Sequence, residues 1–178
     1  MRLPPFNSTK ALHCTCLPKY NLNTYLGRCA HGCIYCYAVK FPSFRGPARP
    51  RTALLDKVEE MARGTREKLP VMISDCTDPY QPLEEECLVT RRCAKVLAEH
   101  RFPLLIVTKS NLVARDIDVF LQTKTVVSMT VTTIRNDIAS LIEPNAPPPG
   151  LRISALRSIG ERGIPTVARA DPIIPTIN

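Results

Sequence analysis

The feature that most constrains the fold of this 178-residue chain is an alternation of short apolar runs with longer amphipathic segments. The run from Leu104 to Val107 is apolar at every position, which is typical of a strand buried on both faces of its sheet. Strands of this kind occur in parallel sheets, where connecting helices cover the faces. The alternation therefore predicts an α/β fold with a parallel sheet.

Five strands are expected, joined by right-handed crossovers. They should cover residues 22–26, 71–74, 104–107, 126–131 and 166–170. Helical spacing predicts four helices between them: Thr52 should cap the first, Thr90 should begin the second, and Gly160 or Gly163 should end the fourth. The apolar positions assigned to these helices are Leu54, Leu55, Val58, Met61 and Ala62; Cys93, Val96 and Leu97; Val113, Ile117, Phe120 and Leu121; and Ile153, Leu156 and Ile159.

The composition indicates one globular domain, because a chain of this length with 44% hydrophobic residues can build a sizeable core. No apolar stretch approaches the roughly 20 residues that span a bilayer, and the first residues lack the apolar core of a secretory signal. We therefore expect a cytoplasmic protein without membrane contact. The net charge of +8 would attract polyanions, which makes nucleic acid a candidate partner.

Three closely spaced cysteines, Cys29, Cys33 and Cys36, can converge on one metal centre. Thiolates prefer zinc, cuprous ions or iron–sulfur clusters, and three of them leave one position of a four-site cluster open. A structural zinc would need a fourth ligand such as His31, Cys14 or Cys16. In a reducing compartment, such a tight group is more typical of metal binding than of disulfides.

The spacing of these cysteines, with the aromatic Tyr35 before the last one, resembles the CxxxCx(aromatic)C signature of the radical S-adenosylmethionine (SAM) enzymes. Three further stretches resemble the branch related to spore photoproduct lyase, often labelled DNA-repair-photolyase-like. They begin at Asn23, at Thr77 and at Pro172. The resemblance runs from about Asn23 to the C-terminus.

The resemblance implies an enzyme in which Cys29, Cys33 and Cys36 hold a [4Fe–4S] cluster. With an electron from a donor such as a flavodoxin or ferredoxin, it would cleave SAM to a 5′-deoxyadenosyl radical. That radical would abstract hydrogen from an unknown substrate, with nucleic acid as one possibility and the lyase or transferase type open. The implied fold is an open, incomplete (β/α) barrel of about five parallel strands. Residues 1–22 would be an N-terminal extension and residues 23–178 a partial core barrel, truncated before its sixth unit.

Candidate site residues follow the predicted strands, where ligands gather in parallel α/β folds. By resemblance, Lys109 and Ser128 match positions near the methionyl carboxylate, Tyr35 lies by the adenine, and residues 74–78 lie near the amino group. Thr130 should share the face of Ser128. The predicted cofactor-binding residues are Tyr35, Ser74, Asp75, Thr77, Lys109, Ser128 and Thr130.

Cys76 and Asp78 are the catalytic candidates. Cys76 could donate hydrogen to a substrate radical, as a cysteine does in spore photoproduct lyase, or it could be a small buried hydrophobe. Asp78 could pair with substrate or with Lys109, or merely start a turn. Lys109 and Ser128 also have non-functional interpretations: Lys109 could be a solvated lysine, and the Ser128 hydroxyl could simply bond to the backbone. His31 could tune the metal centre.

The loop after the cysteines is basic and aromatic. Arg45, Arg49 and Arg51 could meet phosphates, while Phe41 and Phe44 could stack on bases. Alternatively, the loop is solvated and packs its phenylalanines on the domain. A second functional hypothesis is therefore a non-enzymatic zinc or iron–sulfur module that contacts nucleic acid.

Overall fold

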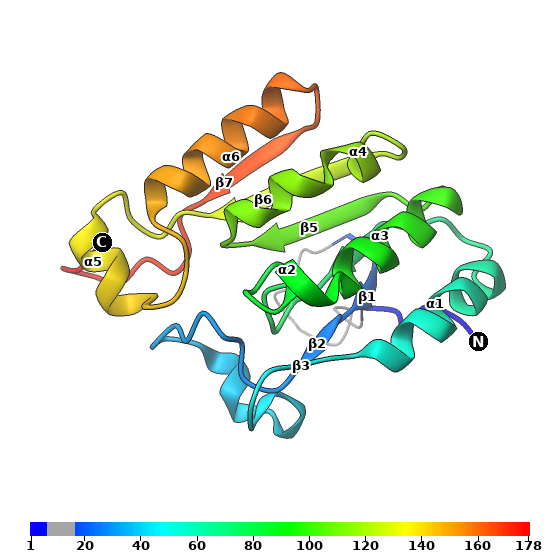
Figure 1. Cartoon of the computed structure of the whole chain (residues 1–178), viewed down its shortest axis with the longest axis horizontal. Coiled ribbons are helices and arrows are strands. Elements are labelled where there is room, and N and C mark those ends of the chain that lie inside the picture. The colour runs from blue at the N-terminus through cyan, green and yellow to red at the C-terminus, as the bar shows by residue number, and fades with distance from the viewer. Residues whose placement is uncertain (7–16) are drawn as a thin grey trace.

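The computed structural model describes residues 1–6 and 17–178, and its centre is a sheet of five parallel strands (Figure 1). The strand order is β1-β4-β5-β6-β7, so β1 and β7 form the two edges and the sheet stays open. The predicted α/β fold with an open sheet of about five parallel strands is confirmed. The strands are β1 (Tyr20–Leu22), β4 (Val71–Ile73), β5 (Leu104–Thr108), β6 (Thr125–Thr130) and β7 (Thr166–Arg169).

Four helices lie on one side of this sheet (Figure 1). They are α1 (Thr52–Gly64), α3 (Val89–Glu99), α4 (Ile117–Phe120) and α6 (Pro149–Glu161). Because side chains alternate along a strand, every second residue points toward the helices. The side chains at these alternate positions pack with those of the helices in one buried core. The strand residues in it include Val71, Ile73, Leu104, Ile106, Val127 and Met129.

The first strand differs from the prediction of 22–26, because the apolar signal there spans two separate elements. Asn23 lies between them and donates from Nδ2 to Asp75 Oδ1 at 3.1 Å. The chain leaves the main sheet there, and β2 (Tyr25–Leu26) pairs antiparallel with β3 (Arg49–Pro50) in a small second sheet.

Two predicted helical stripes also differ from the structure. In the third, Ser110 accepts from Leu112 N and starts a 3₁₀ segment, η4 (Asn111–Asp116), so α4 is short and Leu121 is 51% exposed. In the fourth, Ile153 is 39% exposed, while Arg152 is fully buried beside it. The N-cap of α1 is Arg51, and Thr52 is the first helical residue.

The shorter helices lie in the connecting segments and include two α-helices that the sequence did not predict. These segments are the 3₁₀ turns η2 (Tyr37–Lys40) and η3 (Pro42–Phe44), then α2 (Glu84–Cys87) and α5 (Asn136–Ile142). Within the described part of the chain, no helix has both the length and the apolar character needed to cross a membrane.

Candidate cofactor site

A cavity of about 520 Å³ lies at the carboxyl ends of the central strands, between them and the cysteine loop. Almost all predicted site residues line it, although they come from separate segments of the chain. These are Cys29, Cys33, Tyr35, Cys36, Ser74, Asp75, Cys76, Thr77, Asp78, Lys109 and Thr130. Ser128 is the exception: it is buried further back on β6 and does not line the cavity. Lining residues that the sequence did not single out for the cofactor include Arg28, Tyr37, Thr108, Arg169 and Asp171.

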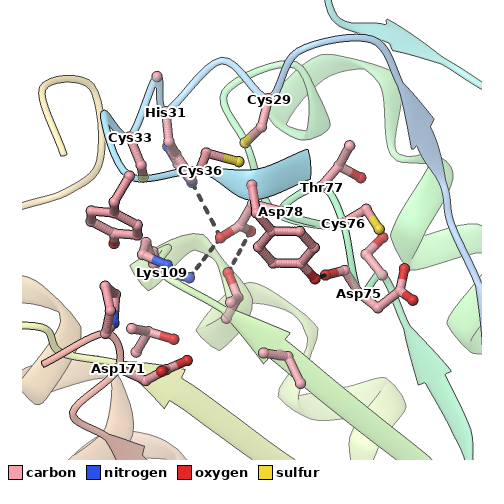
Figure 2. A pocket seen from close by; sticks show the side chains of 18 of the residues that line it. Cys29, His31, Cys33, Cys36, Asp75, Cys76, Thr77, Asp78, Lys109 and Asp171 are labelled. Carbon is pink, nitrogen blue, oxygen red and sulfur yellow. Dashed lines mark hydrogen bonds and ion pairs between the residues drawn. The ribbon is translucent and has the colours of Figure 1, made fainter. Parts of the chain in front are cut away.

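The cysteine loop begins directly after β2 and turns tightly. Gly32 adopts a positive φ of 67°, which glycine accepts without steric cost, and its N–H donates to Cys29 O at 3.1 Å. Cys36 N–H donates in the same way to Cys33 O at 3.3 Å. Figure 2 shows the three cysteines along one wall of the cavity, and all three thiols are free and half-buried.

Contacts from distant segments hold this loop in place. Asn145, just after α5, donates from its backbone N–H to His31 O and from Nδ2 to Ala30 O, both at 3.1 Å. Ile34 N–H donates to Ile142 O at 3.0 Å, at the end of α5. The α5 region therefore positions the cysteines, and sequence reasoning missed this because α5 itself was not predicted.

Asp78 joins the cysteine loop to the ends of two strands. Its carboxylate accepts from Thr108 Oγ1 and Lys109 N, both at 2.6 Å, and His31 Nε2 lies 3.4 Å away (Figure 2). Burial opposes the charged form, but His31 and these hydrogen bonds prevail and lower the pKa of Asp78 to about 2. Asp78 thus accepts from the backbone N–H of Lys109, and its contacts join the ends of β4 and β5 at this corner of the cavity.

Tyr35 and Lys109 lie side by side in the cavity wall. The Lys109 ammonium is 5.5 Å from the centroid of the Tyr35 ring, within cation–π range. The Tyr35 hydroxyl donates to Glu143, which also accepts from Thr132 Oγ1 at 2.5 Å and Arg152 Nη1 at 2.6 Å. The aromatic ring is therefore held at its hydroxyl end, and the lysine lies beside it at the cavity wall.

Ser74, Asp75 and Cys76 form the wall that follows β4. Ser74 has a positive φ of 62°, an uncommon conformation for a residue with a side chain, and it redirects the backbone there. Burial, followed by the charge of Asp75, raises the pKa of Cys76 to about 12. Its thiol is therefore neutral and keeps its hydrogen at physiological pH.

Three free cysteine thiols in one loop are a donor set that an iron–sulfur cluster takes. Among residues 1–6 and 17–178, no three His, Cys, Asp or Glu side chains meet closely enough to hold one metal ion. In a cluster, by contrast, each cysteine thiolate binds a different iron, so the three sulfurs need not meet at one point. Burial raises the pKa of Cys29 to about 12, and coordination to a cation would favour its thiolate. Cys14 and Cys16, candidates for a fourth zinc ligand, lie outside the described residues.

Comparison with known families supports the same chemistry. The model of the radical SAM superfamily matches residues 24–178. An uncharacterized protein of Methanocaldococcus jannaschii is 32% identical over 179 residues, which cover 97% of this chain and 66% of that protein. An uncharacterized protein of Mycobacterium tuberculosis is 26% identical over 173 residues, which cover 89% of this chain and 51% of that protein.

Solved structures of spore photoproduct lyase share the fold. A mutant of that lyase matches with a TM-score of 0.72 at 17% identity, covering 86% of this chain and 45% of the lyase. A second mutant, with bound AdoMet and dinucleoside spore photoproduct, matches with a TM-score of 0.69, also at 17% identity, and covers 86% of this chain and 45% of the lyase. This chain thus spans just under half the length of the lyase and at most about two-thirds of these curated relatives.

Proposed function

Because the chain belongs to the radical SAM superfamily, we propose that it forms the catalytic core of an enzyme that cleaves SAM reductively. The observation that carries this proposal is the convergence of three free thiols, Lys109, Tyr35 and Cys76 on one cavity. When bound, a [4Fe–4S] cluster would supply the electron that breaks a carbon–sulfur bond of SAM, giving methionine and a 5′-deoxyadenosyl radical. The electron donor is proposed to be a flavodoxin or ferredoxin.

Cys29, Cys33 and Cys36 are the proposed cluster ligands, and His31 braces their loop. The Lys109 ammonium is suited to the methionyl carboxylate, because it carries a positive charge at the cavity wall. Tyr35 offers an aromatic face for adenine. The segment from Ser74 to Thr77 supplies hydroxyl and carboxylate groups for the amino group. On β6, Thr130 takes the role that the sequence assigned to Ser128, because only Thr130 lines the cavity.

Cys76 is the proposed hydrogen donor. Its neutral thiol lines the same cavity, so S–H could pass a hydrogen atom to a substrate carbon radical and become a thiyl radical. Asp78 is proposed to act as a positioning residue, because its oxygens are already bound by Thr108, Lys109 and Tyr80 N–H.

Nucleic acid is the proposed substrate class, supported by the charge of +8 and by the fold shared with a lyase that has been solved with a dinucleoside spore photoproduct. We also propose that the protein works in the cytoplasm, where reducing conditions would keep its thiols free. All six cysteines among the described residues are free.

The experiment is anaerobic reconstitution with iron and sulfide, followed by cluster absorbance, iron analysis and detection of 5′-deoxyadenosine. Cys33→Ala should lose both the cluster and SAM cleavage, because it removes one of three ligands. The matched control is Cys87→Ala, which changes a free, half-buried cysteine on α2 and should keep both. A colourless protein holding one zinc, or a Cys33→Ala variant that keeps its cluster, would contradict the proposal and favour the zinc module.

A further inference from the structure

A second, smaller hollow adjoins the cofactor cavity at the cysteine loop, and the two share Arg28, Cys33 and Cys36. Its volume is about 270 Å³, and Cys33 and Cys36 line it as well as the cavity. Ile34, Val39 and Phe44 give it an apolar floor, and Arg28 and Arg45 add two guanidinium groups. Two of the three proposed cluster ligands can thus be approached from a surface that does not require entry into the cavity.

The surface around this hollow is apolar and unusually exposed. Ile34 is 68% exposed, Tyr37 is 57% and Phe41 is 48%, and the rings of Tyr37 and Phe41 pack edge to face. This segment lies at the margin of the molecule next to β2 and β3 (Figure 1, light blue). We call Arg28, Ile34, Val39, Lys40, Phe41 and Arg45 the loop patch. Exposed apolar groups with a polar rim are typical of a protein interface.

The charge of this segment is entirely of one sign. From Arg28 to Leu55 there are five lysine or arginine residues and no aspartate or glutamate, the first acidic residue being Asp56. A surface with this charge attracts an acidic partner and speeds its encounter. The basic rim therefore specifies the partner's charge, while the apolar residues provide the contact area.

We propose that the loop patch docks an acidic one-electron carrier protein, which delivers its electron through Cys33 and Cys36. This inference rests on the proposed function, because it requires a cluster behind these cysteines. An electron donor needs only a close approach to the cluster, whereas a substrate must meet SAM inside the cavity. The hollow offers a close approach to Cys33 and Cys36 from the side of the loop patch.

Nucleic acid fits this patch less well. Phe44, a predicted stacking residue, is buried at 9% exposure. Two predicted phosphate contacts already bond to backbone carbonyls: Arg51 donates to Asn23 O at 2.8 Å, and Arg45 donates to Val39 O and Lys40 O at 3.4 and 3.3 Å. Of the five residues predicted to contact nucleic acid, Phe41 and Arg49 remain exposed, so the loop keeps one ring and one guanidinium for such a contact.

The test uses the reconstituted chain, reduced bacterial flavodoxin as the acidic carrier, and dithionite as a small reductant. Lys40→Glu and Phe41→Ser probe the charge and the apolar part of the patch. Arg45 is left intact because its bonds to Val39 O and Lys40 O hold the loop. Arg157→Glu is the control, since it makes the same charge change at an exposed position on α6.

We expect Lys40→Glu to slow cluster reduction by flavodoxin about fivefold at low salt, with the difference shrinking at high salt. Phe41→Ser should weaken flavodoxin binding about threefold at any salt. Reduction by dithionite should stay unchanged in both, and Arg157→Glu should match the wild type in both assays.

Three results would overturn the inference: no effect of Lys40→Glu, an equal effect of Arg157→Glu, or loss of single-stranded oligonucleotide binding in place of flavodoxin binding. Calorimetric binding of flavodoxin to the cluster-free chain gives a readout that is independent of turnover. If no variant assembles a cluster, the proposed function fails, and this binding assay still decides whether the patch docks the carrier.

Discussion

Glu143 shows how a single buried carboxylate supports the site without lining it. It is 1% exposed and accepts hydrogen bonds from Tyr35, Thr132 and Arg152, which are far apart in the sequence. Arg152, also buried, donates further to Thr130 O and Pro147 O. The aromatic ring proposed to face adenine is thus held by an ion pair inside the domain.

Glu143→Gln should lower the free energy of unfolding by about 3–5 kcal/mol at pH 7, because it leaves the buried Arg152 charge without its partner. Burial opposes the charged form of Glu143, but hydrogen bonds from Thr132 and Tyr35 and the charge of Arg152 lower its pKa below the ordinary 4.5. A lowered folded-state pKa contributes stability above pH 4.5, and that contribution is lost as pH falls through the folded value. The difference between variant and wild type should therefore shrink below pH 4.5.

Urea unfolding at pH 7 and at several values below pH 4.5 measures this difference. Asp137→Asn is the control. The side chains of its ion pair with Arg135 are 64% and 65% exposed, so the variant should unfold at nearly the same urea concentration as the wild type. A pH-independent difference for Glu143→Gln would mean that the carboxylate contributes through shape alone.

At the scale of elements, the segment between α5 and α6 decides where the cysteine loop lies. Asn145→Ala removes the Nδ2 hydrogen bond to Ala30 O and keeps the backbone bond to His31 O. We expect a loss of about 1 kcal/mol in unfolding free energy and faster amide exchange across residues 29–36. Hydrogen exchange by mass spectrometry measures the second effect. Asn136→Ala, at an exposed position on α5, should leave exchange in the cysteine loop unchanged.

Local patterns predicted the elements whose signal is contained in their own residues. The apolar run at Leu104 gave β5, and the stripe beginning at Leu54 gave α1. The pattern failed where side chains bond to distant segments. Asn23 bonds to Asp75 at the point where the chain leaves the main sheet, inside the range predicted for the first strand. Arg152 was not singled out in the sequence, yet Thr130 O on β6 and Glu143 next to α5 accept its hydrogen bonds inside the core.

The candidate site was predictable for a similar reason, because its residues follow strands whose carboxyl ends meet at one edge. Cys76 and Lys109 line the cavity from separate strand ends, as parallel pairing requires. Ser128 lies outside the cavity wall, because alternation gives the face of a strand and does not say how deep along it the cavity reaches. The supporting roles of Asn145 and Glu143 depend on long-range contacts, which a single sequence does not reveal.

Across the whole molecule, a buried network ties the origin of the cysteine loop to the helical layer. Glu84 is fully buried and accepts from Tyr25 Oη on β2 at 2.6 Å, from Thr90 N on α3 at 2.9 Å, and from Arg115 Nη2 on η4 at 3.0 Å. Asp116 extends the network by accepting from Tyr80 Oη at 2.9 Å. Since β2 leads into Cys29, this network links the helices to the start of the cysteine loop.

Glu84→Gln should therefore destabilise the chain as a unit, with a loss of about 1–3 kcal/mol in unfolding free energy. It weakens the buried hydrogen bonds from Tyr25, Thr90 and Arg115, while Arg115 keeps its ion pair with Asp116. The neighbouring Glu85→Gln is the matched control: its side chain is exposed, so its effect should stay within about 0.5 kcal/mol. Hydrogen exchange should rise in β2 and α3 together in the Glu84 variant. Exchange that rises in α3 alone would show that the cysteine loop is positioned independently of this network, leaving the α5 contacts as its main support.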